Sequence, residues 1–529
     1  MKLSPWRHFW RVGSGWSIIL TACVGMVSCY LLSFRWGMPV PAIHDEFAYL
    51  LAGETFAQGR MTNATPPAWE HLETYHVLMQ PSYQAKFPPG QGLLLALGQV
   101  ATGEPIVGVW LSLGLFAAAA TWMLQAYLPA RWAMLGGLAA TAQFGFWGEP
   151  FPGGVVGYWS QTYWGGALAA ASGCLVLGAW TRLCKAPSIR QTLLFSLGVA
   201  GLAITRPFEA LFLLGPLLVV LLCRILRSVP GARWAYFRRV IGPGLLAGLA
   251  LMAGLGVYNH AVTGSAWRLP YQEYERQYSH VPLFLWEKPR TPPVYRHLIQ
   301  ERAFAGWRQV YDAHLTWPGW WEQVQEKLTR LGHFYVGFGL LPPLIALPWV
   351  VRRREMGLLF ALGVAAVAFL VGTVTWCMPH YVAPFTGIVL LVWVQSVRQA
   401  RLWRWSGWPL GRWLVPVYLL LLLVILPLAR LTVTEGGPIS LTWRLERARL
   451  AESLLAEGGR HLVLVEYGPQ AIYHAEWVHN GADPAEAPIV WARAMDAKAD
   501  QALRAAYPQR KAWRVVIAID RPVLVQRLD

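Results

Sequence analysis

The sequence has few charged side chains. Only 14% of its 529 residues are Asp, Glu, Lys or Arg, whereas soluble domains carry about 25%. Acidic residues are scarcer than basic ones, 28 against 45, so the formal net charge is +17. Hydrophobic residues make up 55% of the chain and gather in long runs between residues 16 and 433. This pattern excludes a soluble fold and indicates a protein that crosses a membrane several times.

The sequence also offers neither a disulfide framework nor a nucleotide site. Its six cysteines all lie in or beside apolar runs, and none lies in a long polar segment, so disulfide bonds are not expected. No Gly-rich phosphate-binding motif opens a helix of the C-terminal segment, so no nucleotide is assigned. The basic residues sit in short loops between apolar runs, as cytoplasmic loops do, which argues against a nucleic-acid partner.

Eleven apolar segments predict a polytopic α-helical membrane protein with about 11 transmembrane helices, some of them tilted or re-entrant because they are short. The segments are 16–34, 105–127, 132–147, 160–180, 191–205, 207–226, 240–258, 333–351, 356–375, 381–397 and 411–431. When the N-terminus is placed in the cytoplasm, every arginine-rich loop falls on that side, as the positive-inside rule requires. The segments 35–104, 259–332 and 433–529 are then extracytoplasmic.

The last extracytoplasmic segment differs from the rest of the chain, for which we predict one transmembrane domain over 1–432. Helical patterns over 441–455 and 496–507 alternate with strand patterns. The strand patterns are Leu462–Val465, Ile489–Trp491 and Trp513–Ile519. Alternating strands and helices predict a small extracytoplasmic α/β domain over 433–529.

Two adjacent carboxylates, Asp45 and Glu46, follow the first apolar run. Acids cost several kcal/mol in hydrocarbon, so we expect them at the interface or in a cavity. Residues 45–58 place their large apolar side chains near one face, which predicts a helix lying in the interface. A second helix is predicted to begin at Pro89. The aromatic residues of 259–332 fit either packing against the bilayer surface or stacking on a sugar.

Four short motifs carry a resemblance to a known family. They are Asp45–Glu46 with Tyr49 and Ala52, then Lys86–Phe87–Pro88–Pro89–Gly90, Arg206–Pro207–Phe208–Glu209 and Pro379–His380–Tyr381. Together with the topology, they resemble the GT-C superfamily of integral-membrane glycosyltransferases, in the protein O-mannosyltransferase and aminoarabinose-transferase type of branch. The resemblance covers roughly residues 10–430 and is strongest over 40–105.

The resemblance implies a GT-C-like fold and the transfer of a hexose or pentose from a polyprenyl-phosphate donor to an acceptor hydroxyl at the outer membrane face. Inversion at the anomeric carbon is expected. It also implies a bacterial-type inner membrane, with membrane lipid around the protein and an acceptor that is a lipid, a glycan or a protein. Some members of the superfamily use a divalent cation and others do not. Asp45 and Glu46 would hold such a cation, although nothing in the sequence demands one.

Within this expectation, Asp45 is the candidate general base, because a carboxylate within reach can take the proton of the attacking hydroxyl. Glu46 is the second catalytic candidate. The alternative is structural: Asp45 would cap the interfacial helix, and Glu46 would be an ordinary acid of its first turn.

The candidates for binding the donor phosphate are Lys86, Arg206 and His380, because negative charge grows on the leaving phosphate as the bond breaks. Each has a simpler reading: Lys86 would face lipid headgroups, Arg206 would reach the headgroups with Glu209 as its partner, and His380 would be a hydrogen-bonded interface histidine. The candidate substrate-binding residues are Tyr49, Glu209 and Tyr381.

Other readings of the same features remain open at this point. Glu70, His71, Glu73 and His76 form a solvated polar loop in our interpretation, since histidines five residues apart do not share a helix face. A transporter or flippase of a lipid or sugar is one rival function, and inverted repeats would favour it. A non-catalytic envelope assembly protein that holds a partner through its C-terminal domain is the other.

Overall fold

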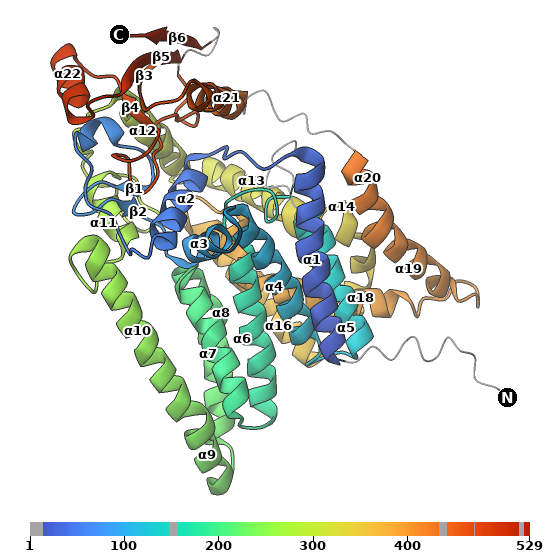
Figure 1. Cartoon of the computed structure of the whole chain (residues 1–529). Coiled ribbons are helices and arrows are strands. Elements are labelled where there is room, and N and C mark those ends of the chain that lie inside the picture. The colour runs from blue at the N-terminus through green and yellow to red at the C-terminus, as the bar shows by residue number, and fades with distance from the viewer. Residues whose placement is uncertain (1–13, 148–156, 433–441, 470, 518–522, 529) are drawn as a thin grey trace.

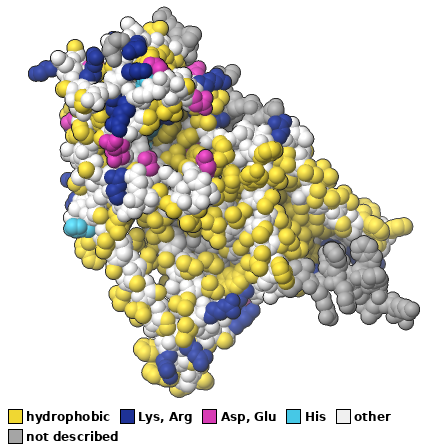
Figure 2. Space-filling model, in the orientation of Figure 1, with side chains coloured by type: hydrophobic (Ala, Val, Ile, Leu, Met, Phe, Trp, Pro, Cys, Tyr) yellow, Lys and Arg dark blue, Asp and Glu magenta, His cyan; other side chains and the backbone are white. Residues whose placement is uncertain are grey.

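Apolar helices form most of the structure, and a small sheet region lies over one end of them (Figure 1). The computed structural model describes residues 14–147, 157–432, 442–469, 471–517 and 523–528. Figure 2 shows hydrophobic side chains over the helical part, whereas charged side chains gather around the sheet region and at the opposite tip near α9. We refer to these two ends as the sheet end and the opposite end. The helical part therefore has the surface of a membrane-embedded body.

Eight helices in the described chain are long and apolar enough to cross a membrane. They are α1 (Ser14–Trp36), α4 (Ile106–Leu124), α6 (Ala167–Lys185), α8 (Pro207–Leu226), α9 to α10 (Pro230–Thr263), α16 (Arg354–Thr373), α17 to α18 (Pro379–Ala400) and α19 to α20 (Leu410–Thr432). A ninth span results if α13 (Trp317–Tyr335) and the segment Gly337–Val351, bent by 70°, are one broken span. The predicted helical membrane architecture is present, and the predicted count of about 11 is not confirmed.

The number of long apolar helices in the described chain is lower than predicted for local reasons. The helix α5 (Ala130–Thr141), which continues as a π-helix over Ala142–Trp147, and α7 (Ile189–Ala203) are apolar but shorter than a simple span. Residues 157–166, where an apolar span was expected to begin, form turns ahead of α6. In addition, α13 begins well inside the stretch that we had expected to be extracytoplasmic up to residue 332.

Several of these spans are composed of shorter pieces that follow one another directly. They are α9 (Pro230–Tyr236), the π-helix Phe237–Ile241, α10 (Gly242–Thr263), α14 (Gly337–Leu340), the 3-10 helix Pro342–Ala346, α15 (Leu347–Val351), α17 (Pro379–Val382), the 3-10 helix Ala383–Phe385, α18 (Thr386–Ala400), α19 (Leu410–Leu420), the π-helix Leu421–Ile425 and α20 (Leu426–Thr432).

Residues 35–104, the first of the three segments predicted to be extracytoplasmic, are called the first outer segment below. They fold into two helices joined by a small hairpin. Helix α2 (His44–Ala57) and α3 (Gly90–Thr102) pack on one another, with a 3-10 turn (Trp69–Leu72) and the paired strands β1 (Val77–Leu78) and β2 (Gln84–Ala85) between them. Pro89 is the N-cap of α3, as the sequence predicted. The later outer segment contributes α11 (Pro270–Gln277) and α12 (Leu298–Ala313) to the same end.

The structure adds two facts about α2 that the sequence did not indicate. The helix does not present a free apolar face to the interface, because the C-terminal region covers it and buries residues such as Ala48 and Leu51. Asp45 is not the cap of the helix either: Ile43 is the N-cap, no side chain caps the helix, and Asp45 lies within the first turn. The acids of α2 are therefore held inside protein rather than at a helix end in water.

The C-terminal region consists of α21 (Thr442–Glu457), α22 (Ala497–Ala506) and a four-stranded sheet in the order β4-β3-β5-β6. The strands are β3 (His461–Tyr467), β4 (Ile489–Arg493), β5 (Lys511–Ile517) and β6 (Leu524–Arg527). β3 pairs in parallel with β4 and β5, and β6 is antiparallel to β5. The strands and helices expected from the sequence are present where described, and residues 518 and 519 of the third expected strand lie outside the described residues.

The C-terminal region and the first outer segment share one hydrophobic core. Leu51 and Leu72 of the outer segment cluster with Leu464, Ala492 and further residues of the sheet. This shared core fixes α2, which carries the acidic pair, against the sheet, while Tyr49 of α2 belongs to the cluster of the membrane helices.

Candidate functional site

A cavity of about 770 Å³ lies at the sheet end, between the outer helices and the membrane helices. Seven of the eight residues predicted for the site line it: Asp45, Tyr49, Lys86, Arg206, Glu209, His380 and Tyr381. They come from α2, the stretch before α3, the start of α8 and α17. Glu46 is the exception. The fold thus brings together residues from four separated parts of the chain.

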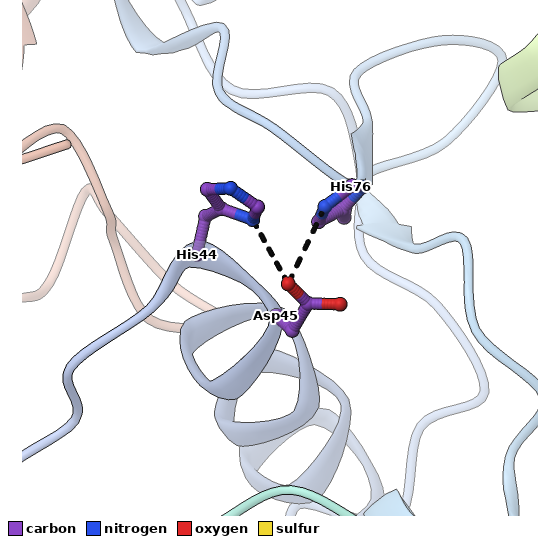
Figure 3. Close-up of side chains that lie close together, drawn as sticks. All are labelled: His44, Asp45 and His76. Carbon is purple, nitrogen blue, oxygen red and sulfur yellow. Dashed lines mark ion pairs between the residues drawn. The ribbon is translucent and has the colours of Figure 1, made fainter. Parts of the chain in front are cut away.

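Asp45 lies at the wall of this cavity and faces two histidines (Figure 3). Its Oδ2 is 3.0 Å from Nδ1 of His44 and 3.6 Å from Nε2 of His76. The other carboxylate oxygen points away from both rings (Figure 3). His76 reaches Asp45 because the hairpin turns the chain back, with a positive φ of 64° at that residue. One carboxylate oxygen is held in place while the other stays available to a substrate.

The electrostatics keep Asp45 ionised. Burial alone would raise its pKa, but interactions with His76, His44 and Lys86 outweigh burial and hold the pKa of Asp45 below its ordinary value. Burial and the Lys86 ammonium hold the pKa of His76 well below its ordinary value. An ionised carboxylate is the protonation state that a general base needs.

Glu46 points away from the cavity. Its carboxylate accepts hydrogen bonds from the backbone N–H groups of Ala42 at 3.1 Å and Tyr163 at 3.0 Å. Burial raises the pKa of Glu46 to about 7, and these hydrogen bonds offset only part of that effect. The geometry gives Glu46 a role in fixing α2 against the turn ahead of α6.

Lys86 is a buried cation at the cavity wall. Only 6% of the residue is exposed, and its Nζ lies 3.3 Å from Oε1 of Glu275. The ammonium also lies 4.5 Å from the ring centre of Tyr271 and 4.4 Å from that of Tyr274. These contacts hold the charge at a fixed point in low dielectric, where it acts more strongly than it would in water.

Arg206 supplies a second cation to the cavity, from the start of α8. It is the N-cap of α8, and its Nη1 lies 3.8 Å from Oε1 of Glu209 in the first turn. Its guanidinium lies 4.8 Å from the ring centre of Tyr381. The Arg206–Glu209 pair anticipated in the structural alternative is present, and both members also line the cavity.

His380 is both hydrogen-bonded and at the cavity. Its Nδ1 shares a hydrogen bond of 2.8 Å with the hydroxyl of Tyr158. That hydroxyl fixes the orientation of the ring and leaves Nε2 free to form a hydrogen bond with a ligand. Tyr49, on α2, stacks on Phe87 with ring centres 4.5 Å apart, which places it between the base and the lysine segment.

Sequence reasoning missed several residues of the site. Tyr271 and Glu275 both line the cavity from α11, and their spacing of four residues on one helix face was the available signal. His44 is the neighbour of Asp45 in sequence and was overlooked, whereas the contact of His76 with Asp45 is long-range and gave no local pattern. Tyr158 was likewise missed, since it lies in a short connection between expected membrane segments, where no motif marked it.

The aromatic outer segment takes part in the site as well as in the surface. Trp307 stacks on His76 with ring centres 6.1 Å apart and nearly parallel planes, 10° from one another. Other aromatic residues of the segment, such as Trp267, which is 84% exposed, face outward. The segment thus contributes both a ring contact beside Asp45 and exposed aromatic side chains.

The residues present would not hold a cation through Asp45 and Glu46, because Glu46 is engaged with backbone N–H groups. The arrangement that fits is His44, Asp45 and His76, whose ligand atoms all lie within 4.8 Å of one another. Nδ1 of His76 is buried without a hydrogen-bond partner among the described residues. The other predicted polar residues disperse: His71 bonds the carbonyl of Arg493 and Glu73 pairs with Arg296.

An apolar groove adjoins the cavity on the membrane side. It has a volume of about 440 Å³ and is lined by Leu93, Ile204, Leu251 and other mostly apolar residues. Pro89, Leu255 and Tyr258 line both the groove and the cavity. The polar cavity and the apolar groove therefore form one continuous surface.

No protein-family model and no curated protein matches the chain. Among solved structures, ArnT from Cupriavidus metallidurans in the apo state is similar with a TM-score of 0.49 and 13% identity, over 95% of this chain and 93% of that one. ArnT bound to undecaprenyl phosphate gives a TM-score of 0.48 and 14% identity, over 96% and 93%. The Archaeoglobus fulgidus oligosaccharyltransferase in its apo form gives 0.48 and 9%, over 90% and 65%.

These structure neighbours are members of the GT-C superfamily. The sequence motifs around Asp45 and Lys86 predicted a resemblance to the same superfamily.

Proposed function

We propose that the protein is a membrane glycosyltransferase that moves a sugar from a polyprenyl-phosphate donor to an acceptor hydroxyl. One observation carries the proposal: a single cavity gathers the Asp45 carboxylate, the Lys86 ammonium and the Arg206 guanidinium. A base and fixed cations in one enclosed space are what the transfer of a sugar from a phosphate requires.

In the proposed reaction Asp45 takes the proton of the acceptor hydroxyl as its oxygen attacks the anomeric carbon. The bond from that carbon to the phosphate oxygen breaks, and the electron pair leaves with the lipid phosphate. Lys86 and Arg206 stabilise the growing negative charge, and His380 orients the phosphate. A single displacement inverts the configuration at the anomeric carbon.

The apolar groove gives the donor's hydrocarbon chain a place beside the reacting phosphate. Leu93 and Leu251 would contact the first isoprene units, while Tyr258 lies where groove and cavity meet. We place the sheet end on the extracytoplasmic side, since the positively charged connections lie at the opposite end. Tyr49 and Tyr381 are proposed to contact the sugar or the acceptor.

The function is tested by extracting lipid from the purified full-length protein and identifying it by mass spectrometry. We expect a polyprenyl-phosphate sugar, and reconstituted vesicles should transfer that sugar to an acceptor. The Asp45→Asn variant should bind the donor yet transfer none of its sugar.

Asp312→Asn, which changes an acid on α12 that pairs with Arg308 and does not line the cavity, is the matched control and should keep full activity. Full transfer by Asp45→Asn would contradict the assignment of the base. Lipid movement across the vesicle without any transfer would favour a flippase instead.

A further inference from the structure

The opposite end of the molecule holds a second, smaller cavity. It has a volume of about 230 Å³ and lies where α5 begins and where α15 and α18 end. Because α17 and α18 form one span that starts at His380 in the first cavity, the two cavities face opposite sides of the membrane. Nothing in the proposed sugar transfer uses this second cavity.

Four arginines line it: Arg131, Arg353, Arg398 and Arg401. The described lining contains no carboxylate, and the acid nearest in sequence, Glu355, is not part of it. None of the four arginines forms an ion pair within the part of the chain that the structure describes. Like charges so close to one another repel, and a bound anion would relieve that repulsion.

Two helix starts add to the positive potential. α5 begins at Ala130, directly before Arg131, and Arg353 is the N-cap of α16. The unpaired N–H groups at the first turn of a helix favour anions. Arg131 and Arg353 thus stand at helix starts as well as at the cavity wall.

The positive-inside rule accounts for Arg131, Arg353 and Arg401, which are exposed, but not for the orientation of the half-buried Arg398. It explains arginines at cytoplasmic helix ends, which ordinarily extend outward into water and headgroups, as around α9. Arg398 is instead oriented: its Nη1 donates a hydrogen bond of 3.0 Å to Oε1 of Gln395, and its guanidinium lies 5.8 Å from the ring centre of Trp132. An oriented guanidinium is preorganised to bind a phosphate with two parallel hydrogen bonds.

The surroundings place the cavity at headgroup depth. Its wall includes the apolar residues Trp132, Val350 and Leu402. Exposed tryptophans follow immediately in sequence, with Trp405 64% and Trp408 76% exposed. Tryptophan is enriched at membrane interfaces, so this stretch is expected to lie among the headgroups.

We propose that this cavity binds a phosphate-bearing anion, supplied by the headgroup of an anionic lipid in the adjacent leaflet. The volume is smaller than the roughly 300–1,000 Å³ of sites for drug-sized ligands, which suits a phosphate with a small substituent. The same phosphate chemistry would accept a free phosphate compound, and the experiment separates the two sources. Basic pockets between membrane helices are known places for such headgroups.

The test uses the purified full-length protein in detergent and native mass spectrometry with two probes, phosphatidylglycerol and phosphatidylcholine. We expect the protein to retain phosphatidylglycerol and to lose it when Arg398 and Arg401 are both replaced by Gln, with affinity falling about tenfold or more. The matched control replaces Arg238 and Arg239, two cations near α9 outside the cavity, and should retain the lipid. Thermal unfolding of each variant confirms that it is folded.

A third arm adds inorganic phosphate at increasing concentration. Displacement only at high concentration assigns the site to the lipid, and tight binding of phosphate itself assigns it to a free phosphate compound. The single variant Arg353→Gln, at an exposed chain connection, should weaken binding in the same direction if the double variant does not fold. Equal retention of both lipids, or unchanged binding by the cavity variants, would overturn the proposal.

Discussion

The ammonium of Lys86 lies 3.3 Å from the carboxylate of Glu275, although the two residues belong to different outer segments of the chain. The pair joins the stretch before α3 to α11 at the wall of the larger cavity. Glu275 compensates the buried cation while the site is empty of substrate. A donor phosphate entering the cavity would share or replace that carboxylate as the partner of Lys86.

Replacing Lys86 with Gln should therefore reduce kcat/KM for sugar transfer by about 100-fold, because the leaving phosphate loses a fixed cation in a low-dielectric site. Steady-state kinetics in reconstituted vesicles measure this change. Lys498→Gln, on the exposed surface of α22, is the control and should behave as the wild type. Wild-type kinetics for Lys86→Gln would show that Lys86 serves only to neutralise Glu275.

Transfer should survive the removal of divalent cations by EDTA. Lys86 and Arg206 already supply two positive charges to the phosphate, so the proposed chemistry does not need a metal. Activity before and after dialysis, together with metal analysis of the protein, checks this. Loss of activity that a particular cation restores would instead assign His44, Asp45 and His76 as a metal site.

Stability should fall as the pH rises from 6 to 8, with Glu46 responsible for part of the loss. Its folded pKa is about 7, above the ordinary value of 4.5, so the folded state holds a proton that the unfolded state has released. Stability then decreases as pH passes through the folded pKa, by about 1.4 kcal/mol over this range. Chemical unfolding of wild type and Glu46→Gln at both pH values should show a smaller slope for the variant.

An equal pH slope in the two proteins would mean that Glu46 is not the titrating group. The neighbouring Asp45 gives the opposite sign, since its pKa is lowered on folding. The stability that Asp45 contributes is lost only as the pH falls through that lowered value, far below this range.

Arg493 on β4 forms a buried ion pair with Glu476 and donates from Nε to the carbonyl of Glu73 in the first outer segment. Replacing Arg493 with Met should cost about 3–5 kcal/mol, because Glu476 is left as an uncompensated buried charge. Unfolding in denaturant measures the loss of stability. Limited proteolysis should also be faster in the region where the first outer segment contacts the sheet.

The double variant Arg493→Met with Glu476→Leu provides the control for that prediction. Removing both charges avoids the uncompensated acid, so the double variant should be more stable than the single one. Additive losses would show that the two side chains act independently.

The sequence predicted those parts of the molecule that depend on local patterns. Apolar runs located the membrane helices, and Pro89 located the start of α3. The helix α13, which together with the next segment is long and apolar enough to be one bent span, was not predicted, because it is amphipathic rather than uniformly apolar. Helix length decided the count, and length is what apolar runs define least well.

Within the candidate site, the predicted residues were those carried by a motif, such as Asp45 and Lys86. The residues that hold them in place were missed because their contacts are long-range. His76 meets Asp45 only through the hairpin, and the tail residue His474, whose ring stacks on His44 at 5.5 Å, lies at the far end of the chain. A local sequence pattern cannot predict contacts between residues that lie so far apart in the chain.

The core shared by the first outer segment and the C-terminal sheet also sets an order for biogenesis. Leu51 and Leu72 leave the ribosome early, whereas their partners Leu464 and Ala492 emerge only near the end of synthesis. The membrane helices are inserted in the meantime, around a pocket that still lacks part of its support. Helix α2, which carries Asp45, therefore lacks its packing against the sheet until translation is nearly complete.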